Sequence, residues 1–475
     1  GASRSRDGGG RRCGRDEGRD RDRRRKGAAK SPRHGGAAKS PRSVSAECAA
    51  AAVSVEASPA AAFTAEEDEE ESEYTSDDSY ETDSSEELDG DAALAKALKK
   101  QKKEQPKKED IVHFDWSVGM LLNSRYKVSK LLGDGTFGRV LFVEDQKRDR
   151  KLAVKVIRNV EKYIRNAKRE AEILQDIKKA DAKKAAGSVR MHDTFWHQTP
   201  GGEGFFCLAF EVLGASLYDL LKQNRFRGLW VQDIQSIAQQ SLEALAFLHD
   251  ELQLTHTDLK LENVLFQTTD DFIPAEFPRL QAYLEAHPSQ KGKTPSQYVR
   301  PASTRIKLID FGNATYSLEH HSSVINTRQY RAPEVILATG WDERSDLWSV
   351  GCIIMELYTG ELLFRTHESL EHLALMEKAV EAFPSMMLEN AANERRELFL
   401  AKVEQTLWRL DWPEKASSPK SEQHVRSQRR LPELVLERHR PLADFVASLL
   451  ILEPARRPSA SAALAHPFLF ERLTD

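Results

Sequence analysis

The pattern of hydrophobic and polar positions changes abruptly near residue 126. Residues 126–157, YKVSKLLGDGTFGRVLFVEDQKRDRKLAVKVI, form short segments in which apolar and polar side chains alternate, separated by glycines and a charged turn. Alternation with a period of two is typical of strands, and such turns are typical of hairpins. We therefore predict an antiparallel sheet over this stretch.

Helical spacing replaces alternation further along the chain. In residues 231–250, VQDIQSIAQQSLEALAFLHD, the apolar side chains that fall on one helical face are Ile234, Ile237, Ala238, Leu242, Leu245 and Leu248. Strands first and helices afterwards predict an α+β fold with two lobes. We place a small β-rich lobe at 109–213 and a large helical lobe at 214–475.

The first 108 residues show neither pattern. An Arg-rich block with two Ser-Pro steps lies in residues 1–50, an acidic block without a single basic residue in 66–91, and a Lys-rich block in 96–108. Blocks of like charge with few apolar residues cannot bury enough surface to offset chain entropy, so we predict a disordered tail over 1–108. The acidic block is interpreted as a solvated tail. The basic blocks fit either the same reading or nuclear import and docking to anionic partners, including RNA.

Composition excludes several classes of protein. The chain has 475 residues and a net charge of -4, and its four cysteines form no CxxC pair. This spacing argues against a zinc site and for reduced thiols in an intracellular protein. No apolar run approaches the roughly 20 residues that cross a bilayer, and the N-terminus is polar, so we expect a soluble protein without membrane contact, and a monomer.

Within the predicted sheet, Gly133, Gly135 and Gly138 form the pattern GxGxxG. The pattern alone is weak evidence, because it also marks dinucleotide-binding folds and some tight turns. Here a strand follows it rather than a helix, and Lys155 lies on the next strand but one. This arrangement fits a Gly-rich flap over the phosphates of ATP, with the lysine facing their charge.

Such a lysine needs an acidic partner, and the helical stretch NAKREAEILQDI offers Glu170 and Glu172. Helical neighbours of Glu170 include Ala167 and Ile173, whereas those of Glu172 are charged or polar. Glu170 therefore borders the buried face. We assign the ion pair to Lys155 and Glu170 and interpret Glu172 as a surface charge.

The stretch LTHTDLKLENVLF carries Asp258, Lys260 and Asn263 in an apolar run, and IKLIDFGNA and YRAPE follow later. These motifs occur in the order of the protein kinases, whose catalytic loop reads H-R-D-L-x-x-x-N, and the chain resembles that family. Asp258 would orient the substrate hydroxyl and accept its proton, and Lys260 would steady the γ-phosphate. Asn263 and Asp310 are oxygen ligands suited to Mg²⁺.

The histidines are interpreted differently. His256 is read as a packed structural residue, because Asp258 already fills the role of base. The adjacent pair His320 and His321 is read as non-ligating, since neighbouring side chains diverge and no second ligand pair accompanies them.

The resemblance to kinases also implies an adenine site. Phe210 in CLAFEVLGAS would be the bulky gatekeeper, and the backbones of Glu211 and Leu213 would bond adenine. The apolar residues implied around the nucleotide are Val140, Ala153 and Leu265.

Longer stretches narrow the resemblance to the LAMMER, or CLK-type, kinases over about residues 111–473. They are HTDLKLENVLF, DFGNATYSLEHHSSVINTRQYRAPEVILATGW and RTHESLEHLALMEK, the last being similar to the signature EHLAMMERILG. The chain departs from the signature at Leu375 and Lys378, and Leu261 stands where most kinases have Pro. Segments near 267–305 and 365–430 match insertions of the family, and HFDWSVGMLLNSRYKV is similar to its added hairpin.

Further roles follow only from the resemblance. It implies a nuclear, ATP- and Mg²⁺-dependent kinase that phosphorylates serines in Arg/Ser-rich splicing factors, and also itself on tyrosine. Thr327 would bond the catalytic Asp and Lys, Asp346 would brace the catalytic loop, and Glu334 would pair with Arg457.

Two alternatives remain at this stage. A DYRK-type kinase would carry a tyrosine at position 324, which is Val324 here. A catalytically dead scaffold or RNA-binding protein would not need the full set of Lys155, Asp258, Asn263 and Asp310. Thr257 occupies the position of the Arg in H-R-D, so we expect the activation loop to be held by packing and by Arg328 and Arg331.

Overall fold

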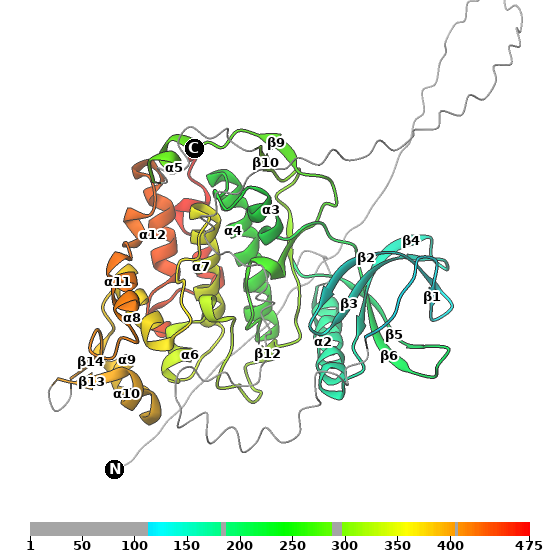
Figure 1. Ribbon diagram of the computed structural model, residues 1–475, viewed down its shortest axis with the longest axis horizontal. Coiled ribbons are helices and arrows are strands. Elements are labelled where there is room, and N and C mark those ends of the chain that lie inside the picture. Colours follow the sequence, from blue (N-terminus) through cyan, green and yellow to red (C-terminus); the bar gives the residue numbers. More distant parts are fainter. Residues whose placement is uncertain (1–112, 182–186, 287–296, 404–406) are drawn as a thin grey trace, which may run out of the picture. The chain divides into compact units, whose positions relative to one another are not determined.

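The protein is described by a computed structural model over residues 113–181, 187–286, 297–403 and 407–475. The predicted disordered tail, residues 1–108, lies outside the described residues. The predicted α+β fold, with a β-rich lobe followed by a helical lobe, is confirmed (Figure 1).

The small lobe is a six-stranded antiparallel sheet accompanied by one long helix, α2 (Figure 1). The strand order is β1-β2-β3-β4-β6-β5. The bounds are β1 Leu121–Leu122, β2 Tyr126–Gly135, β3 Gly138–Asp145, β4 Arg150–Ile157, α2 Glu161–Ala180, β5 Met191–Gln198 and β6 Gly204–Phe210.

Alternation along the strands divides the sheet into two buried faces. On β4, Leu152, Val154 and Val156 join a cluster with Phe114 and Phe205 on one face. The intervening Ala153 and Ile157 belong to the core that includes α2 and the large lobe. Both faces are covered, and apart from Lys155 the polar residues of β4, Arg150 and Lys151, lie at its start.

The expected added hairpin is shorter than the sequence suggested. Residues 113–120 form no strand, and β1 contributes only two residues, which pair with the start of β2. Phe114 is nevertheless buried against the sheet. The extension therefore acts mainly as an apolar cover.

The large lobe is built around α4 and α7, which pack against each other. Its main elements are α3 Leu217–Gln223, α4 Val231–Ala246, β7 Leu254–Thr255, β8 Val264–Phe266, β11 Ile306–Leu308, β12 Thr315–Tyr316, α6 Pro333–Leu337, α7 Arg344–Thr359, α8 Ser369–Ala379, α12 Arg440–Leu449 and α13 Ala460–Ala463. The predicted apolar face of α4 is buried as expected, and Leu248 continues it into a π-helical turn, Phe247–Glu251.

The segments interpreted as insertions carry their own small elements. Residues 267–305 contain β9 Ile273–Ala275, α5 Leu280–Ala286 and β10 Tyr298–Arg300, and β9 pairs with β10. After α8 come α9 Ser385–Glu389, α10 Asn393–Phe399, β13 Leu400–Lys402, β14 Trp408–Leu410 and α11 Pro419–Ser427. Within the described ranges, no helix has the length and apolar character to span a membrane.

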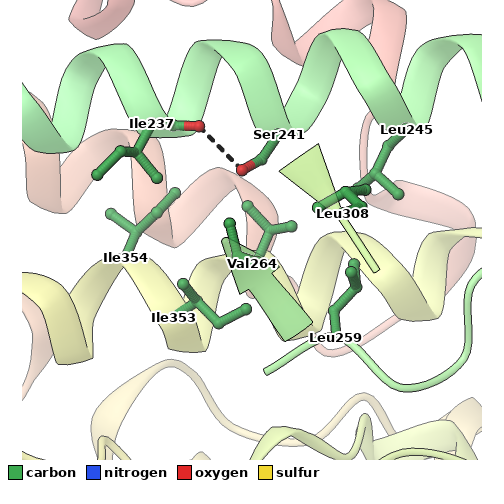
Figure 2. A pocket seen from close by; sticks show the side chains of 9 residues that line it. Ile237, Ser241, Leu245, Leu259, Val264, Leu308, Ile353 and Ile354 are labelled. Carbon is green, nitrogen blue, oxygen red and sulfur yellow. Dashed lines mark hydrogen bonds between the residues drawn. The ribbon is translucent and has the colours of Figure 1, made fainter. Parts of the chain in front are cut away.

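An apolar floor lies under the loop that follows β7. Side chains from α4, α7, that loop and the short strands β8 and β11 line a small pocket here (Figure 2), namely Ile237, Ser241, Leu245, Leu259, Val264, Leu308, Val350, Ile353 and Ile354. The hydroxyl of Ser241 donates back to the carbonyl oxygen of Ile237 at 2.9 Å, so the polar atom of this buried side chain is hydrogen-bonded (Figure 2). The floor anchors Leu259 between the polar residues of the loop.

Candidate active site

The lysine of β4 and the glutamate of α2 meet as predicted. Lys155 Nζ lies 3.0 Å from Glu170 Oε2, and Glu170 is buried whereas Glu172 is exposed. Lys155 Nζ also lies 3.6 Å from Asp310 Oδ1. Burial alone would lower the pKa of Lys155, but the carboxylates of Glu170 and Asp310 outweigh it and raise that pKa, so the ammonium stays charged.

The carboxylate of Asp258 is held on both sides. Its Oδ1 accepts hydrogen bonds from the Thr327 hydroxyl at 2.8 Å and from Thr327 N at 3.2 Å. Lys260 Nζ lies 3.2 Å from Asp258 Oδ2 and donates to the Thr327 hydroxyl oxygen at 3.2 Å. The structure thus brings together Asp258 and Lys260, to which the sequence assigned the substrate hydroxyl and the γ-phosphate, and Thr327 bonds both of them as the resemblance implied.

Asn263 and Asp310 stand near this group. Asn263 Nδ2 donates to the carbonyl oxygen of Asp258 at 2.8 Å, which fixes the amide so that its oxygen is the end left for a ligand. Burial would raise the pKa of Asp310, yet Lys155 and the other nearby cations lower it overall, so it is an anionic oxygen donor. The strand before it, β11, ends at Leu308, because Asp310 itself adopts a left-handed conformation with φ 64°.

A buried carboxylate braces the loop from below. Asp346, on α7, accepts from His256 N at 2.8 Å and from Thr257 N at 3.0 Å, and it also bonds His249 Nε2. His256 Nδ1 accepts from Asp258 N at 3.3 Å, while its Nε2 lies 3.0 Å from the carbonyl oxygen of Ile309. His256 therefore links the loop to Ile309, the residue directly after β11, and is structural, as interpreted.

Thr257 has an unusual backbone. Its φ is 69°, a left-handed value that is rare for a β-branched residue. All of its polar groups are bonded, because its carbonyl oxygen accepts from both nitrogens of Asn326 at 2.9 Å and its hydroxyl donates to the carbonyl oxygen of Asn313 at 2.9 Å. These bonds hold a conformation that would otherwise be costly.

The glycines of the flap differ in why they are needed. A Cβ on Gly138 would stand 2.1 Å from the carbonyl oxygen of Val156, so the fold itself requires glycine there. A Cβ on Gly133 would meet no described atom within 4 Å, and one on Gly135 only the carbonyl oxygen of Gly138 at 3.9 Å. At these two positions close approach of a phosphate is the better reason for glycine.

The predicted adenine residues lie on the sheet and on the segment that joins the lobes. Ala153 pairs with Phe210 across β4 and β6, Val140 pairs with Lys155 across β3 and β4, and Leu265 pairs with Lys307 across β8 and β11. Glu211 N donates to the carbonyl oxygen of Arg190 at 3.0 Å, so only the carbonyl of Glu211 is left for adenine. No hydrogen bond to Leu213 N occurs within the described part of the chain.

Sequence reasoning missed a charged tie at this joining segment. The carboxylate of Glu211 accepts from Arg190 N at 2.8 Å and pairs with Lys307 Nζ. Lys307 occurs in IKLIDFG, but nothing in the sequence indicates that it reaches a residue 96 positions away.

A pocket joins the flap, α2 and the catalytic loop. Beside predicted residues it is lined by Phe137, Asn166 and Asn313, which were not singled out as site residues. Phe137 packs edge-on against Tyr163 of α2, with ring centroids 5.3 Å apart. Asn166 lies one helical turn before Glu170, and that spacing was the available signal for it.

Arg331, one of the two arginines predicted to hold the segment from Asp310 to Glu334, bonds backbone oxygens within it. Arg331 donates to the carbonyl oxygens of Ile325 at 2.9 Å and Asn326 at 3.0 Å. His321 stacks on Trp341, with ring centroids 4.1 Å apart, and the described residues contain no cluster of three or more His, Cys, Asp or Glu side chains that could hold a metal ion. Glu334 pairs with Arg457, both fully buried, at 2.5 Å.

The stretch similar to the LAMMER signature forms α8, most of which is buried. Leu375, one of the departures, is completely buried, whereas Lys378 is exposed. Glu371 accepts from the Thr366 hydroxyl at 2.7 Å and also from the Ser421 hydroxyl of α11. The helix therefore anchors the insertion rather than presenting itself to solvent.

Comparisons with known proteins agree with this geometry. The family model of the protein kinase domain matches residues 126–469. Serine/threonine-protein kinase AFC2 of Arabidopsis thaliana is 40% identical over 368 residues, covering 76% of this chain and 80% of that protein. Dual specificity protein kinase CLK2 of Homo sapiens is 38% identical over 363 residues, covering 76% and 67%. The crystal structure of the PF14_0431 kinase domain is similar with a TM-score of 0.67 at 42% identity, covering 75% of this chain and 99% of that one.

Proposed function

Because the chain belongs to the protein kinase family, and within it to the LAMMER, or CLK-type, kinases, we propose that it phosphorylates serines of Arg/Ser-rich proteins that act in pre-mRNA splicing, with Mg²⁺ as its metal. Family membership makes it a serine/threonine-protein kinase that uses ATP. The substrate class, the metal and a nuclear location are the proposal.

Phosphoryl transfer depends mainly on positioning and on neutralising charge. Thr327 and Lys260 hold the Asp258 carboxylate in one orientation, in which it would align the substrate hydroxyl and accept its proton. The Lys155 ammonium, fixed by Glu170, would bind phosphate oxygens. Each residue thus has one task, and none forms a covalent bond to the phosphoryl group.

The donor set at the metal position fits a hard divalent cation. Asp310 offers a carboxylate and Asn263 an amide oxygen, and no Cys or His is among the described residues that line the pocket beside Asp310. Oxygen ligands of this kind favour Mg²⁺ over zinc. When bound, Mg²⁺ would neutralise charge on the phosphates of ATP.

One observation carries the substrate proposal: the catalytic loop holds an acidic group whose charge the nearby Lys260 offsets only in part. Among the described residues, nothing hydrogen-bonds the buried Glu262 Oε2. Burial raises the pKa of Glu262; Lys260 opposes this, and the carboxylates of Asp258 and Asp219 add to it. A guanidinium from an Arg-rich substrate would relieve this excess of acid.

The test is a peptide array, with rates on Arg-Ser repeats compared with rates on acidic peptides. We expect Arg-Ser repeats to be faster by at least about tenfold, a difference of about 1.4 kcal/mol. Glu262→Gln should remove most of that preference, while Glu172→Gln, on the exposed side of α2, should keep it. Equal rates on both peptide classes would contradict the proposal. The array also shows whether Pro after the serine matters.

Location is proposed from the sequence blocks, which lie outside the described residues. The Arg-rich and Lys-rich blocks within 1–108 would direct nuclear import and make weak contacts with RNA, and the catalytic part would act as a monomer. A chain starting at Asp110 should keep its turnover number on a short peptide but lose nuclear accumulation. Unchanged accumulation after deletion of both basic blocks would refute the location.

A further inference from the structure

Four residues join α2 to the segment that follows Gly312, and we call them the α2 clamp: Arg169 and Asp176 on α2, and Tyr316 and Glu319 beyond Gly312. Arg169 forms an ion pair with Glu319. The Tyr316 hydroxyl donates to Asp176 Oδ2 at 3.0 Å. The guanidinium of Arg169 also lies 5.6 Å from the centre of the Tyr316 ring. An ion pair, a hydrogen bond and a cation–π contact therefore fasten the same stretch to the same helix.

The α2 clamp lies close to the catalytic ion pair. Arg169 and Asp176 are seven residues apart, which is about two helical turns, so they share a face of α2. Glu170 follows Arg169 directly and reaches Lys155 at 3.0 Å. Because a helix moves as a rigid unit, whatever holds Arg169 and Asp176 also sets the distance from Glu170 to Lys155.

The other end of the α2 clamp is itself fixed to the catalytic loop. Tyr316 and Thr315 form β12, which pairs with Leu254 and Thr255 of β7. Two residues before β12, the Asn313 carbonyl oxygen accepts the Thr257 hydroxyl. A continuous path thus runs from the catalytic loop through 313–316 to α2.

We propose that the α2 clamp positions Glu170 against Lys155 and replaces a loop phosphate in keeping this kinase active. The four residues are positioning residues, since none of them lines the pocket formed around Lys155, Asp258 and Asp310, and they act through Glu170. The proposal rests on kinase activity but not on which proteins are phosphorylated, so a generic basic substrate protein serves as the reporter. A wrong substrate proposal would leave this test intact.

The experiment reverses the ion pair in the full chain. Arg169→Glu places two carboxylates together, and we expect kcat to fall about tenfold while the KM for ATP changes less than twofold, because the adenine residues on β4, β6 and the joining segment are untouched. Adding Glu319→Arg should restore kcat to within about twofold of wild type. In a Glu170→Gln background, Arg169→Glu should cost less than twofold further, since its effect passes through Glu170.

Two further variants keep the test decisive. Arg165→Glu, made at an exposed α2 pair with Glu161 one turn earlier, is the matched control and should leave kcat unchanged. Tyr316→Phe removes a single hydroxyl and should lower kcat about threefold even if the charge reversals fold poorly. Full kcat in both Arg169→Glu and Tyr316→Phe, no rescue by Glu319→Arg, or an equal loss in Arg165→Glu would each overturn the proposal.

Discussion

The hydroxyl of Thr257 donates a hydrogen bond to the carbonyl oxygen of Asn313 at 2.9 Å, and this bond ties the catalytic loop to the segment that follows Gly312. In kinases that read His-Arg-Asp here, the arginine is a cation that a phosphorylated activation loop satisfies. Thr257 is buried and carries no charge, so it makes a neutral bond instead. The activation segment is therefore held without a phosphate partner at this position.

Removal of loop phosphate should have little effect on the rate. We expect protein stripped by phosphatase, with the loss of loop phosphate verified by mass spectrometry, to keep its initial rate within about threefold, a barrier change of roughly 0.7 kcal/mol. A fall of a hundredfold or more, reversed by autophosphorylation, would show that a loop phosphate is required.

Asp310→Asn should nearly abolish activity without unfolding the protein. The amide keeps the left-handed backbone that this position needs, because Asn tolerates positive φ. It removes the anionic oxygen next to Lys155, and the loss of such a preorganised charge costs about 10²- to 10³-fold in kcat. Turnover and thermal unfolding should be measured beside Asp271→Asn, an exposed control. Wild-type turnover in Asp310→Asn would refute the metal assignment.

Lys307→Met should weaken ATP binding more than it slows turnover. Lys307 holds the carboxylate of Glu211, whose carbonyl is the proposed adenine acceptor, so its loss would free the joining segment. We expect the KM for ATP to rise about fivefold, or about 1 kcal/mol, with kcat within twofold. Lys307→Arg should recover most of this, and Lys151→Met at the exposed start of β4 should change nothing. An unchanged KM would mean that the tie plays no part in nucleotide binding.

Glu356 should make folding stability depend on pH. Burial raises its pKa from 4.5 to about 8, although the hydroxyl of Tyr330 donates to it at 2.7 Å and opposes the shift. Between these values the folded chain holds a proton that the unfolded chain has released, so stability falls as pH rises from about 4.5 to 8 by up to about 1.4 kcal/mol per pH unit. Urea unfolding at pH 5.5 and 7.5 should show a smaller fall in Glu356→Gln, and parallel curves would contradict this origin.

Local pattern predicted those parts of the site whose partners are fixed by spacing. Helical neighbours distinguished Glu170 from Glu172, and the structure buries only the first. Motif order placed Asp258, Lys260 and Asn263 on one loop, and the resemblance supplied Thr327 and Asp346, which both bond that loop. Short-range sequence spacing and known motifs were sufficient to predict these residues.

Contacts between distant segments could not be predicted in this way. Asp176 and Tyr316 are 140 residues apart. From the sequence alone, Asp176 looks like an ordinary charge on a helix surface and Tyr316 like an ordinary aromatic residue. The ion pair between Glu211 and Lys307 likewise joins residues that are far apart in the sequence. The left-handed backbone of Thr257 also escaped prediction, because threonine rarely adopts it and only the surrounding bonds enforce it.

The burial of Glu371 makes α8, the stretch by which the family is recognised in sequence, almost invisible from outside the folded protein. Its residues from Leu370 to Met376 are all buried, and the carboxylate of Glu371 accepts hydrogen bonds from the hydroxyls of Thr366 and Ser421. An antibody raised against a peptide of residues 369–379 would therefore recognise the chain on a denaturing blot. It would fail to bind the chain in a native immunoprecipitation. The family's signature is thus an epitope of the unfolded state.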